Sequence, residues 1–192
     1  MTASTSNPAA APDLAADELE SLRYPIGRFR FEATLEPAAR AACIERIASL
    51  PRELASAVEG LDDRQLDTPY RPGGWTARQV VHHVADSHMN GYTRVRLALT
   101  EDTPTIKPYA EAEWARLDDA RLPVEVSLRL LEALHERWVV TLRGVADRDF
   151  VRTVVHPEWD HPLSLDVLLQ NYDWHGRHHT GHVVGLRGRM GW

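Results

Sequence analysis

The sequence predicts an all-α protein, a four-helix bundle with a long connection between its second and third helices. Four long segments carry helix start signals or apolar stripes of helical period. Turn and loop residues separate these segments, and the connection between the second and third covers residues 101–122. Bundles with a long crossover connection are one of the recurring all-α architectures, which is why we predict this fold class.

The chain ahead of the bundle divides into two parts. Residues 1–21 are rich in Ala, Pro, Ser, Thr and Asp, and we expect a disordered N-terminal tail. Residues 22–33, which include the run Tyr24-Pro25-Ile26-Gly27, indicate an ordered extended segment. A chain of 192 residues suits one domain, so we assign residues 22–192 to a single metal-binding bundle domain.

The first predicted helix covers residues 36–60. Thr34 is a suitable capping residue, and Pro37 is tolerated in the first turn. Pro51 should kink or interrupt this helix, because it has no backbone N–H to donate.

The second predicted helix covers residues 77–99, after the turn at Gly73-Gly74. Thr76 and Gln79 have the spacing of a capping box. We expect a short helix near 110–117 within the connection that follows.

The third predicted helix covers residues 123–145 and begins with Pro123, a favoured first residue. It carries an apolar stripe, made up of Leu128, Leu131, Leu134, Trp138 and Leu142. Residues 146–163 contain two His-Pro pairs, so we predict a loop there.

Charge and composition exclude several classes of protein. The formal net charge is −6 and the arginines are scattered, which argues against a nucleic-acid or membrane-surface binder. The single cysteine, Cys43, lies in an apolar helical stretch and is interpreted as a core residue, not a nucleophile. No secretory signal and no apolar run long enough to span a membrane is present, so we expect a cytoplasmic protein.

The fourth predicted helix covers residues 164–189, with Ser164 as its cap and Asp166 in its first turn. It contains two histidine pairs at i, i+4 spacing, His175 with His179 and His178 with His182. Either pair lies on one helix face and could chelate a metal ion.

Periodicity favours His175 and His179 as the pair that faces the bundle interior. Their stripe is otherwise apolar or aromatic, and its other members are Leu165, Leu168, Tyr172, Val183 and Leu186. Buried imidazoles need polar partners, and a shared metal ion would satisfy both rings. Hydrogen bonding within the core, or an exposed histidine cluster, explains the pattern about as well at this point.

A third ligand should come from a facing helix, and the second helix offers His82, His83 and His88. His82 lies on a face that is expected to be largely solvated. His83 and His88 lie on equally apolar faces, so periodicity leaves both open. If His83 is the ligand, Asn90 and Arg94 share its face and could meet a substrate beside the metal; a packed or solvated helix face would explain them equally simply.

Other histidines and motifs add little. His135 is interpreted as a core or surface histidine, and His156 and His161 as loop residues before prolines. The chain has no HExxH motif, no Gly-rich phosphate loop and no G-x-S-x-G elbow.

Several stretches together resemble the DinB-like superfamily, and in particular its YfiT branch, whose members are described as metal-dependent hydrolases and bacillithiol S-transferases. The stretches are YPIG at 24–27, LDTPYRPGGWTARQVVHHVADSHMN at 66–90, PTIKPY at 104–109, WHGRHHTGHV at 174–183 and RMGW at 189–192. The resemblance extends from about Tyr24 to Trp192.

The resemblance implies a four-helix bundle with a metal at a three-histidine site. The family's first ligand follows a tryptophan by eight residues, which places it at His83 after Trp75 and not at His88. Its other two ligands match His175 and His179. The resemblance also implies a homodimer.

Three neutral imidazoles would leave open positions on a divalent ion, with zinc as the expected metal and nickel as the alternative. The open position could activate a water or a thiol, so the catalytic group would be metal-bound water or thiolate. No carboxylate partner is evident as a general base, which favours thiol transfer, with Arg94 holding a carboxylate of the small thiol.

We therefore predict a thiol S-transferase of the bacillithiol type that acts on small electrophiles. The alternatives are a metal-dependent hydrolase of small amides or esters, and a non-catalytic metal-binding stress protein. The expected partners are a small-molecule thiol and an electrophilic substrate, with no nucleic acid and no membrane.

Overall fold

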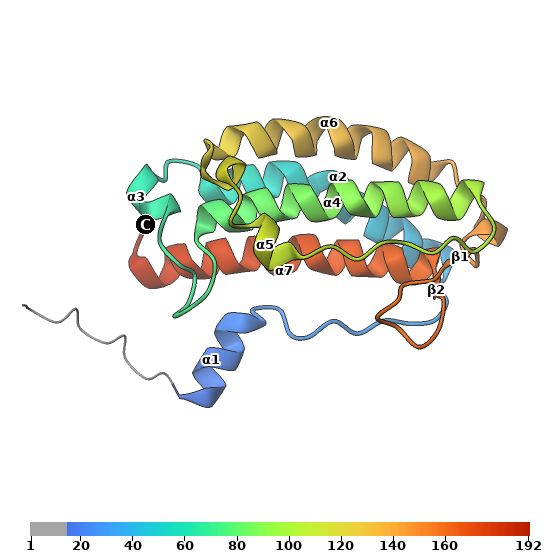
Figure 1. Ribbon diagram of the computed structural model, residues 1–192, viewed down its shortest axis with the longest axis horizontal. Coiled ribbons are helices and arrows are strands. Elements are labelled where there is room, and N and C mark those ends of the chain that lie inside the picture. The colour runs from blue at the N-terminus through green and yellow to red at the C-terminus, as the bar shows by residue number, and fades with distance from the viewer. Residues whose placement is uncertain (1–14) are drawn as a thin grey trace, which may run out of the picture.

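Four long helices pack into a bundle in the computed structural model, which describes residues 15–192 (Figure 1). The helices are α2 (Pro37–Val58), α4 (Ala77–Thr100), α6 (Val124–Arg143) and α7 (Leu165–Met190). Both α2 and α4 pack against α6 and α7, so each helix has two long neighbours. The predicted all-α four-helix bundle is confirmed. In the described part of the chain, no helix combines the length and apolarity needed to cross a membrane.

Local signals placed two of the helix starts correctly. Helix α4 begins with a complete capping box, in which the Gln79 N–H donates to Thr76 Oγ1 at 3.1 Å and the Thr76 N–H donates to Gln79 Oε1 at 3.0 Å. Helix α7 begins after Ser164, whose Oγ accepts from the Val167 N–H at 3.3 Å. The cap predicted at Thr34 is wrong, because α2 begins at Pro37 and its N-cap is Glu36.

Of the two effects predicted for Pro51, a kink or an interruption, the interruption does not occur, because α2 continues through it. Pro51 cannot donate to the carbonyl of Ile47, four residues earlier. That carbonyl instead accepts a hydrogen bond from Nδ1 of His135 on α6, at 2.7 Å. A neighbouring helix therefore supplies the donor that the proline lacks.

The connections contain more structure than expected. The first holds a short helix, α3 (Asp63–Leu66), with its own capping box. The short helix predicted near 110–117 is present as α5 (Glu111–Trp114), and the 3-10 helix η1 (Asp118–Arg121) follows it in the long connection. The predicted loop at 146–163 contains the 3-10 helix η2 (Asp147–Asp149) and the start of a small antiparallel sheet formed by β1 (Thr153–Val154) and β2 (Leu163–Ser164).

A helix precedes the bundle where a disordered tail was predicted. Helix α1 (Ala16–Arg23) has acidic residues in its first turn and an arginine in its last, an arrangement that suits the helix dipole. It buries none of its own residues, and it lies outside the bundle on the side of α7 (Figure 1). The prediction for residues 1–21 is therefore wrong for its last part, and its first 14 residues lie outside the described chain.

The apolar core consists of two clusters separated at one level of the bundle. One cluster includes Ile47, Val95, Trp138 and Tyr172, and the other includes Leu50, Ala85, Leu131 and Val183. Histidines separate the two clusters along three of the helices: His88 on α4, His135 on α6, and His175 and His179 on α7. A layer of buried histidines thus divides the core.

Two further features tie the helices together. Asp166 accepts from Arg40 through two bonds, at 2.7 Å (Nε to Oδ1) and 2.8 Å (Nη2 to Oδ2), and from the Leu35 N–H at 3.0 Å, all in buried surroundings. Gly91 lets α4 approach its neighbours closely, because a Cβ there would lie 2.5 Å from the ring of Tyr172 and 2.8 Å from that of Trp138.

Candidate metal centre

The three predicted ligands converge in the histidine layer. His83 comes from α4, and His175 and His179 come from successive turns of α7. One ring nitrogen of each residue lies within 4.8 Å of those of the other two, and His83 Nε2 is 3.1 Å from His175 Nε2. His83 and His179 are buried, and His175 is half-buried. We refer to these three residues as the histidine triad.

The geometry of the histidine triad fits a divalent metal ion. Two nitrogens that each lie about 2.0–2.1 Å from a tetrahedral zinc ion are about 3.3 Å apart, close to the separation found between His83 and His175. Burial lowers the pKa of His83 to about 4, with a smaller contribution from His182, and holds the pKa values of His175 and His179 well below the usual range. The rings are therefore neutral near pH 7, which is the metal-binding form.

His88, the residue that periodicity could not separate from His83, lies behind the histidine triad. It is completely buried, and its Nε2 is 3.3 Å from Nδ1 of His175, on the side of that ring away from His83. Its Nδ1 is 3.0 Å from Nε2 of His135, which is buried as well. His88 and His135 are thus outer partners of His175 in this arrangement, and His135 belongs to the core and not to the surface.

His82 is buried, so the prediction of a solvated face is wrong. Its Nδ1 is 2.7 Å from Ser127 Oγ and its Nε2 is 3.0 Å from the carbonyl oxygen of Leu122. The connection between α4 and α6 covers this face, which a pattern within α4 cannot reveal. Asp86, whose pKa burial raises to about 6, lines a small cavity of about 130 Å³ beside His82 and away from the histidine triad.

The second histidine pair of α7 is buried too, although its stripe was interpreted as a flank. His178, His179 and His182 form a second group whose ring nitrogens lie within 4.8 Å of one another. Nδ1 of His182 is 3.3 Å from Nδ1 of His179, and its Nε2 is 3.1 Å from the carbonyl oxygen of Arg23 in α1. Tyr70 stacks on the His182 ring at a centroid distance of 3.9 Å.

The predicted substrate residues, Asn90 and Arg94, are engaged in hydrogen bonds within the protein. Asn90 donates through Nδ2 to the Asp86 carbonyl at 2.8 Å, one turn back on its own helix. Arg94 donates to Tyr172 Oη at 3.1 Å and to the Lys107 carbonyl at 3.2 Å. Arg94 is half-buried, and its partner Tyr172 precedes His175 on α7 by about one helical turn. The guanidinium therefore lies against the side of α7 that carries His175.

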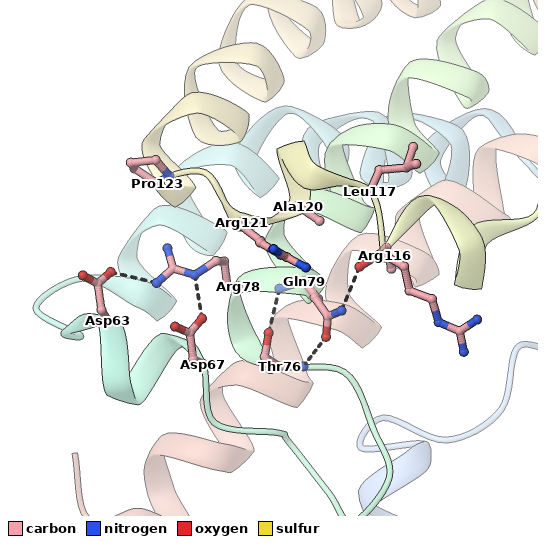
Figure 2. A pocket seen from close by; sticks show the side chains of 11 residues that line it. Asp63, Asp67, Thr76, Arg78, Gln79, Arg116, Leu117, Ala120, Arg121 and Pro123 are labelled. Atoms are coloured by element: carbon pink, nitrogen blue, oxygen red, sulfur yellow. Dashed lines mark hydrogen bonds and ion pairs between the residues drawn. The ribbon is translucent and has the colours of Figure 1, made fainter.

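A separate polar pocket of about 740 Å³ lies between α3, α4 and η1 (Figure 2). Arg78 forms one wall and is paired with Asp63 and Asp67, both at 2.7 Å. Gln79 is held by the capping box and by its bond to the Ala115 carbonyl at 2.8 Å. The side chains of Arg78 and Gln79 are therefore already paired within the protein. No member of the histidine triad lines this pocket.

Comparison with known proteins gives consistent matches over most of the chain. The sequence profile of the DinB superfamily matches residues 46–183. Two relatives, from Bacillus mycoides (strain KBAB4) and Bacillus cereus (strain ATCC 10987 / NRS 248), carry the name "Putative metal-dependent hydrolase". Each is 52% identical over 174 residues, which is 91% of this chain and 100% of the relative.

A solved structure agrees with both the fold and the sequence matches. It is described as "YfiT from Bacillus subtilis is a probable metal-dependent hydrolase with an unusual four-helix bundle topology". The TM-score is 0.87 at 45% sequence identity, and the match covers 90% of this chain and 99% of the other.

Proposed function

Since the chain belongs to the DinB superfamily, we propose that it is a metal-dependent enzyme whose divalent ion is held by His83, His175 and His179. The observation that carries the proposal is the convergence of three neutral imidazoles, two buried and one half-buried, from two helices on one point. The names of the relatives, which describe metal-dependent hydrolases, support it. Zinc is the ion we propose, with nickel as the alternative, because imidazole ligands accept both.

The ligand set determines what chemistry the site can perform. A divalent ion bound there supplies Lewis acidity and lowers the pKa of a water or thiol beside it. All three protein ligands are neutral, so they leave the positive charge of the ion undiminished. The protein thus favours a partner that becomes an anion on binding, and the buried surroundings strengthen that attraction.

We propose a thiol S-transferase that joins a small-molecule thiol to a small electrophile. The thiol loses its proton to solvent, its sulfur forms a bond to the electrophilic carbon, and the leaving group departs with its electron pair. Within residues 15–192, burial raises the pKa of two carboxylates near this region, Asp86 and Glu111, and Asp86 lies on the His82 side of α4. Among the described residues the two candidate ligand groups consist of histidines alone, and a reaction that needs no carboxylate base fits such a set.

A metal-dependent hydrolase of small amides or esters is the second candidate, and the names of the relatives favour it. A non-catalytic metal-binding stress protein is the third. We also propose a homodimer in the cytoplasm, to be tested by light scattering and by cell fractionation.

Metal content tests the first step of the proposal. Protein without a histidine tag is analysed by mass spectrometry beside the His83→Ala and His179→Ala variants, with His161→Ala as a matched control in an exposed loop. We expect one ion per chain in the wild type and the control, and loss of the ion in both triad variants. A wild type that holds no metal after reconstitution with zinc and with nickel would overturn the proposal.

The reaction is then tested with cysteine as the thiol and 1-chloro-2,4-dinitrobenzene as the electrophile. Loss of the electrophile that requires both thiol and metal supports the S-transferase. Turnover of an aryl ester or amide without thiol supports the hydrolase. If neither reaction is observed, the result supports the non-catalytic metal-binding protein.

Arg94 is proposed to hold a carboxylate of the thiol, with Asn90 contacting the same substrate. Arg94 uses two of its five N–H groups within the protein, so three remain for a ligand. Arg94→Ala is expected to raise the KM for cysteine about tenfold, in line with the loss of a charge-assisted bond. Arg96→Ala is the matched control, because Arg96 lies two residues later on the exposed side of α4. An unchanged KM in Arg94→Ala would remove this role.

A further inference from the structure

We propose that two chains of hydrogen-bonded histidines fix the tautomers of His175 and His179, so that Nε2 of each ring keeps its lone pair for the metal. Each chain ends on a backbone carbonyl that its own helix leaves without an N–H partner. The consequence for metal binding rests on the proposed function, whereas the tautomers themselves are a property of the metal-free protein.

The longer chain runs from the histidine triad through the core to α2. His175 Nδ1 lies 3.3 Å from His88 Nε2, and His88 Nδ1 lies 3.0 Å from His135 Nε2. His135 Nδ1 then lies 2.7 Å from the carbonyl oxygen of Ile47. His88 and His135 are at most 2% exposed, so water does not compete for these bonds.

The carbonyl at the end of the longer chain sets the direction of every bond in it. A carbonyl oxygen only accepts, so His135 must donate through Nδ1 and accept at Nε2. His88 therefore donates through Nδ1 and accepts at Nε2, which leaves His175 to donate through Nδ1. A neutral ring has one N–H, so Nε2 of His175 carries a lone pair, and this is the nitrogen that faces His83.

His88 and His135 are enclosed in the core, and these surroundings favour the neutral form of both rings. A charged ring would donate from both nitrogens and break the one-way order of the chain.

The shorter chain runs from His179 to α1. His182 Nε2 lies 3.1 Å from the carbonyl oxygen of Arg23 and must donate to it. His182 Nδ1 therefore accepts, and it lies 3.3 Å from Nδ1 of His179, which must donate. Nε2 of His179 then keeps its lone pair for the triad. The stacked ring of Tyr70 covers His182 and holds it in this orientation.

Both terminal carbonyls are free for a local reason. The carbonyl of Ile47 would normally accept from residue 51, and Pro51 has no N–H. Arg23 is the last residue of α1, where helix carbonyls have no partner further along the helix. Each carbonyl takes a histidine N–H as its donor, at Ile47 inside the core and at Arg23 on the more exposed α1.

The shorter chain of hydrogen bonds leaves the described residues with one metal site. A metal ion in the second group, His178 with His179 and His182, would need a ring nitrogen of His182. Both are engaged, Nδ1 with Nδ1 of His179 and Nε2 with the carbonyl oxygen of Arg23. We therefore assign the second group to support of the first site.

Nitrogen-15 NMR of the histidine-labelled, metal-free protein near pH 7 tests the tautomers directly. We expect Nδ1–H forms for His175, His179, His88 and His135, and the Nε2–H form for His182, with signals assigned from single-histidine variants. An Nε2–H form at His175 or His179 would overturn the proposal. This readout needs neither metal nor activity, so a failure of the proposed function would not obscure it.

Zinc affinity, measured by competition with a chelator, tests the consequence. His135→Phe breaks the longer chain and His182→Phe the shorter, and each is expected to weaken zinc binding 10-fold to 100-fold, the usual range for outer partners of a ligand. His135→Gln and His182→Gln, which can still donate to the carbonyls, should recover part of the loss, and the exposed His161→Phe is the control. Folded Phe variants that keep zinc affinity within twofold, or a wild type that binds two ions per chain, would overturn the proposal. Should a Phe variant not fold, the Gln variants and the wild-type spectrum still decide.

Discussion

Alanine at position 91 would test how closely α4 approaches α6 and α7. Its Cβ would lie 2.5 Å from both Cε1 and Cζ of Tyr172 and 2.8 Å from Cη2 of Trp138, far inside normal contact distance. The two rings are 2% and 1% exposed, and they are rigid and enclosed, so neither can turn aside. The helices themselves must separate to admit the methyl group.

The size of the effect follows from two opposing terms. Overpacking of a core costs about 1–3 kcal/mol, and contact with two rigid rings places Gly91→Ala near the upper end, at about 3 kcal/mol. Alanine is better than glycine in a helix by about 1 kcal/mol. The net expectation is a free energy of unfolding lower by about 2 kcal/mol. Gly188→Ala, where no atom lies within 4 Å of the new Cβ, should gain up to about 1 kcal/mol.

Urea denaturation of the metal-free protein, followed by circular dichroism, measures both variants. Similar m values would show that the comparison concerns the same cooperative unit. Gly91→Ala should unfold at a lower urea concentration than the wild type, and Gly188→Ala at the same or a higher one. A Gly91→Ala protein as stable as the wild type would refute the reasoning, because the separation of the helices would then not be set by the two rings.

Three further outcomes are expected. Asp166→Asn removes the carboxylate that pairs with the buried guanidinium of Arg40 through two bonds, and it should lower the free energy of unfolding by about 3–5 kcal/mol. Glu113→Gln, at an exposed ion pair, should change the free energy of unfolding by less than about 1 kcal/mol in the same urea assay. The metal-free protein should lose stability as the pH falls from about 6.5 to about 4. Burial lowers the pKa of His83 and His135 to about 4, so in this pH window the unfolded chain binds protons that the folded chain does not. A urea midpoint that stays constant over this window would contradict the prediction. Saturating zinc should raise the thermal unfolding temperature of the wild type but not of His83→Ala, as measured by scanning calorimetry.

The sequence predicted those features that depend on residues close together in the chain. Thr76 and Gln79 are three positions apart, and the capping box they form needs no other part of the fold. His175 and His179 are four apart, so their shared face follows from helix geometry alone.

The features that were missed depend on distant parts of the chain. The burial of His182 comes from Arg23 and Tyr70, which are far from it in sequence, so its own stripe misled the interpretation. The choice between His83 and His88 could not be made from periodicity, because both residues are buried and both contact His175 of α7, His83 at its Nε2 and His88 at its Nδ1. The resemblance favoured His83, and the geometry places that residue in the histidine triad.

Pro51 has a consequence for protein engineering. A proline inside a helix is among the first residues that a designer would replace to gain thermostability, and a library selected for heat resistance would favour Pro51→Ala. The new N–H would lie within reach of the Ile47 carbonyl and compete with His135 for it. Selection for heat resistance alone would thus erode the support of a histidine ligand on another helix. A programme to stabilise this protein should score metal retention alongside melting temperature.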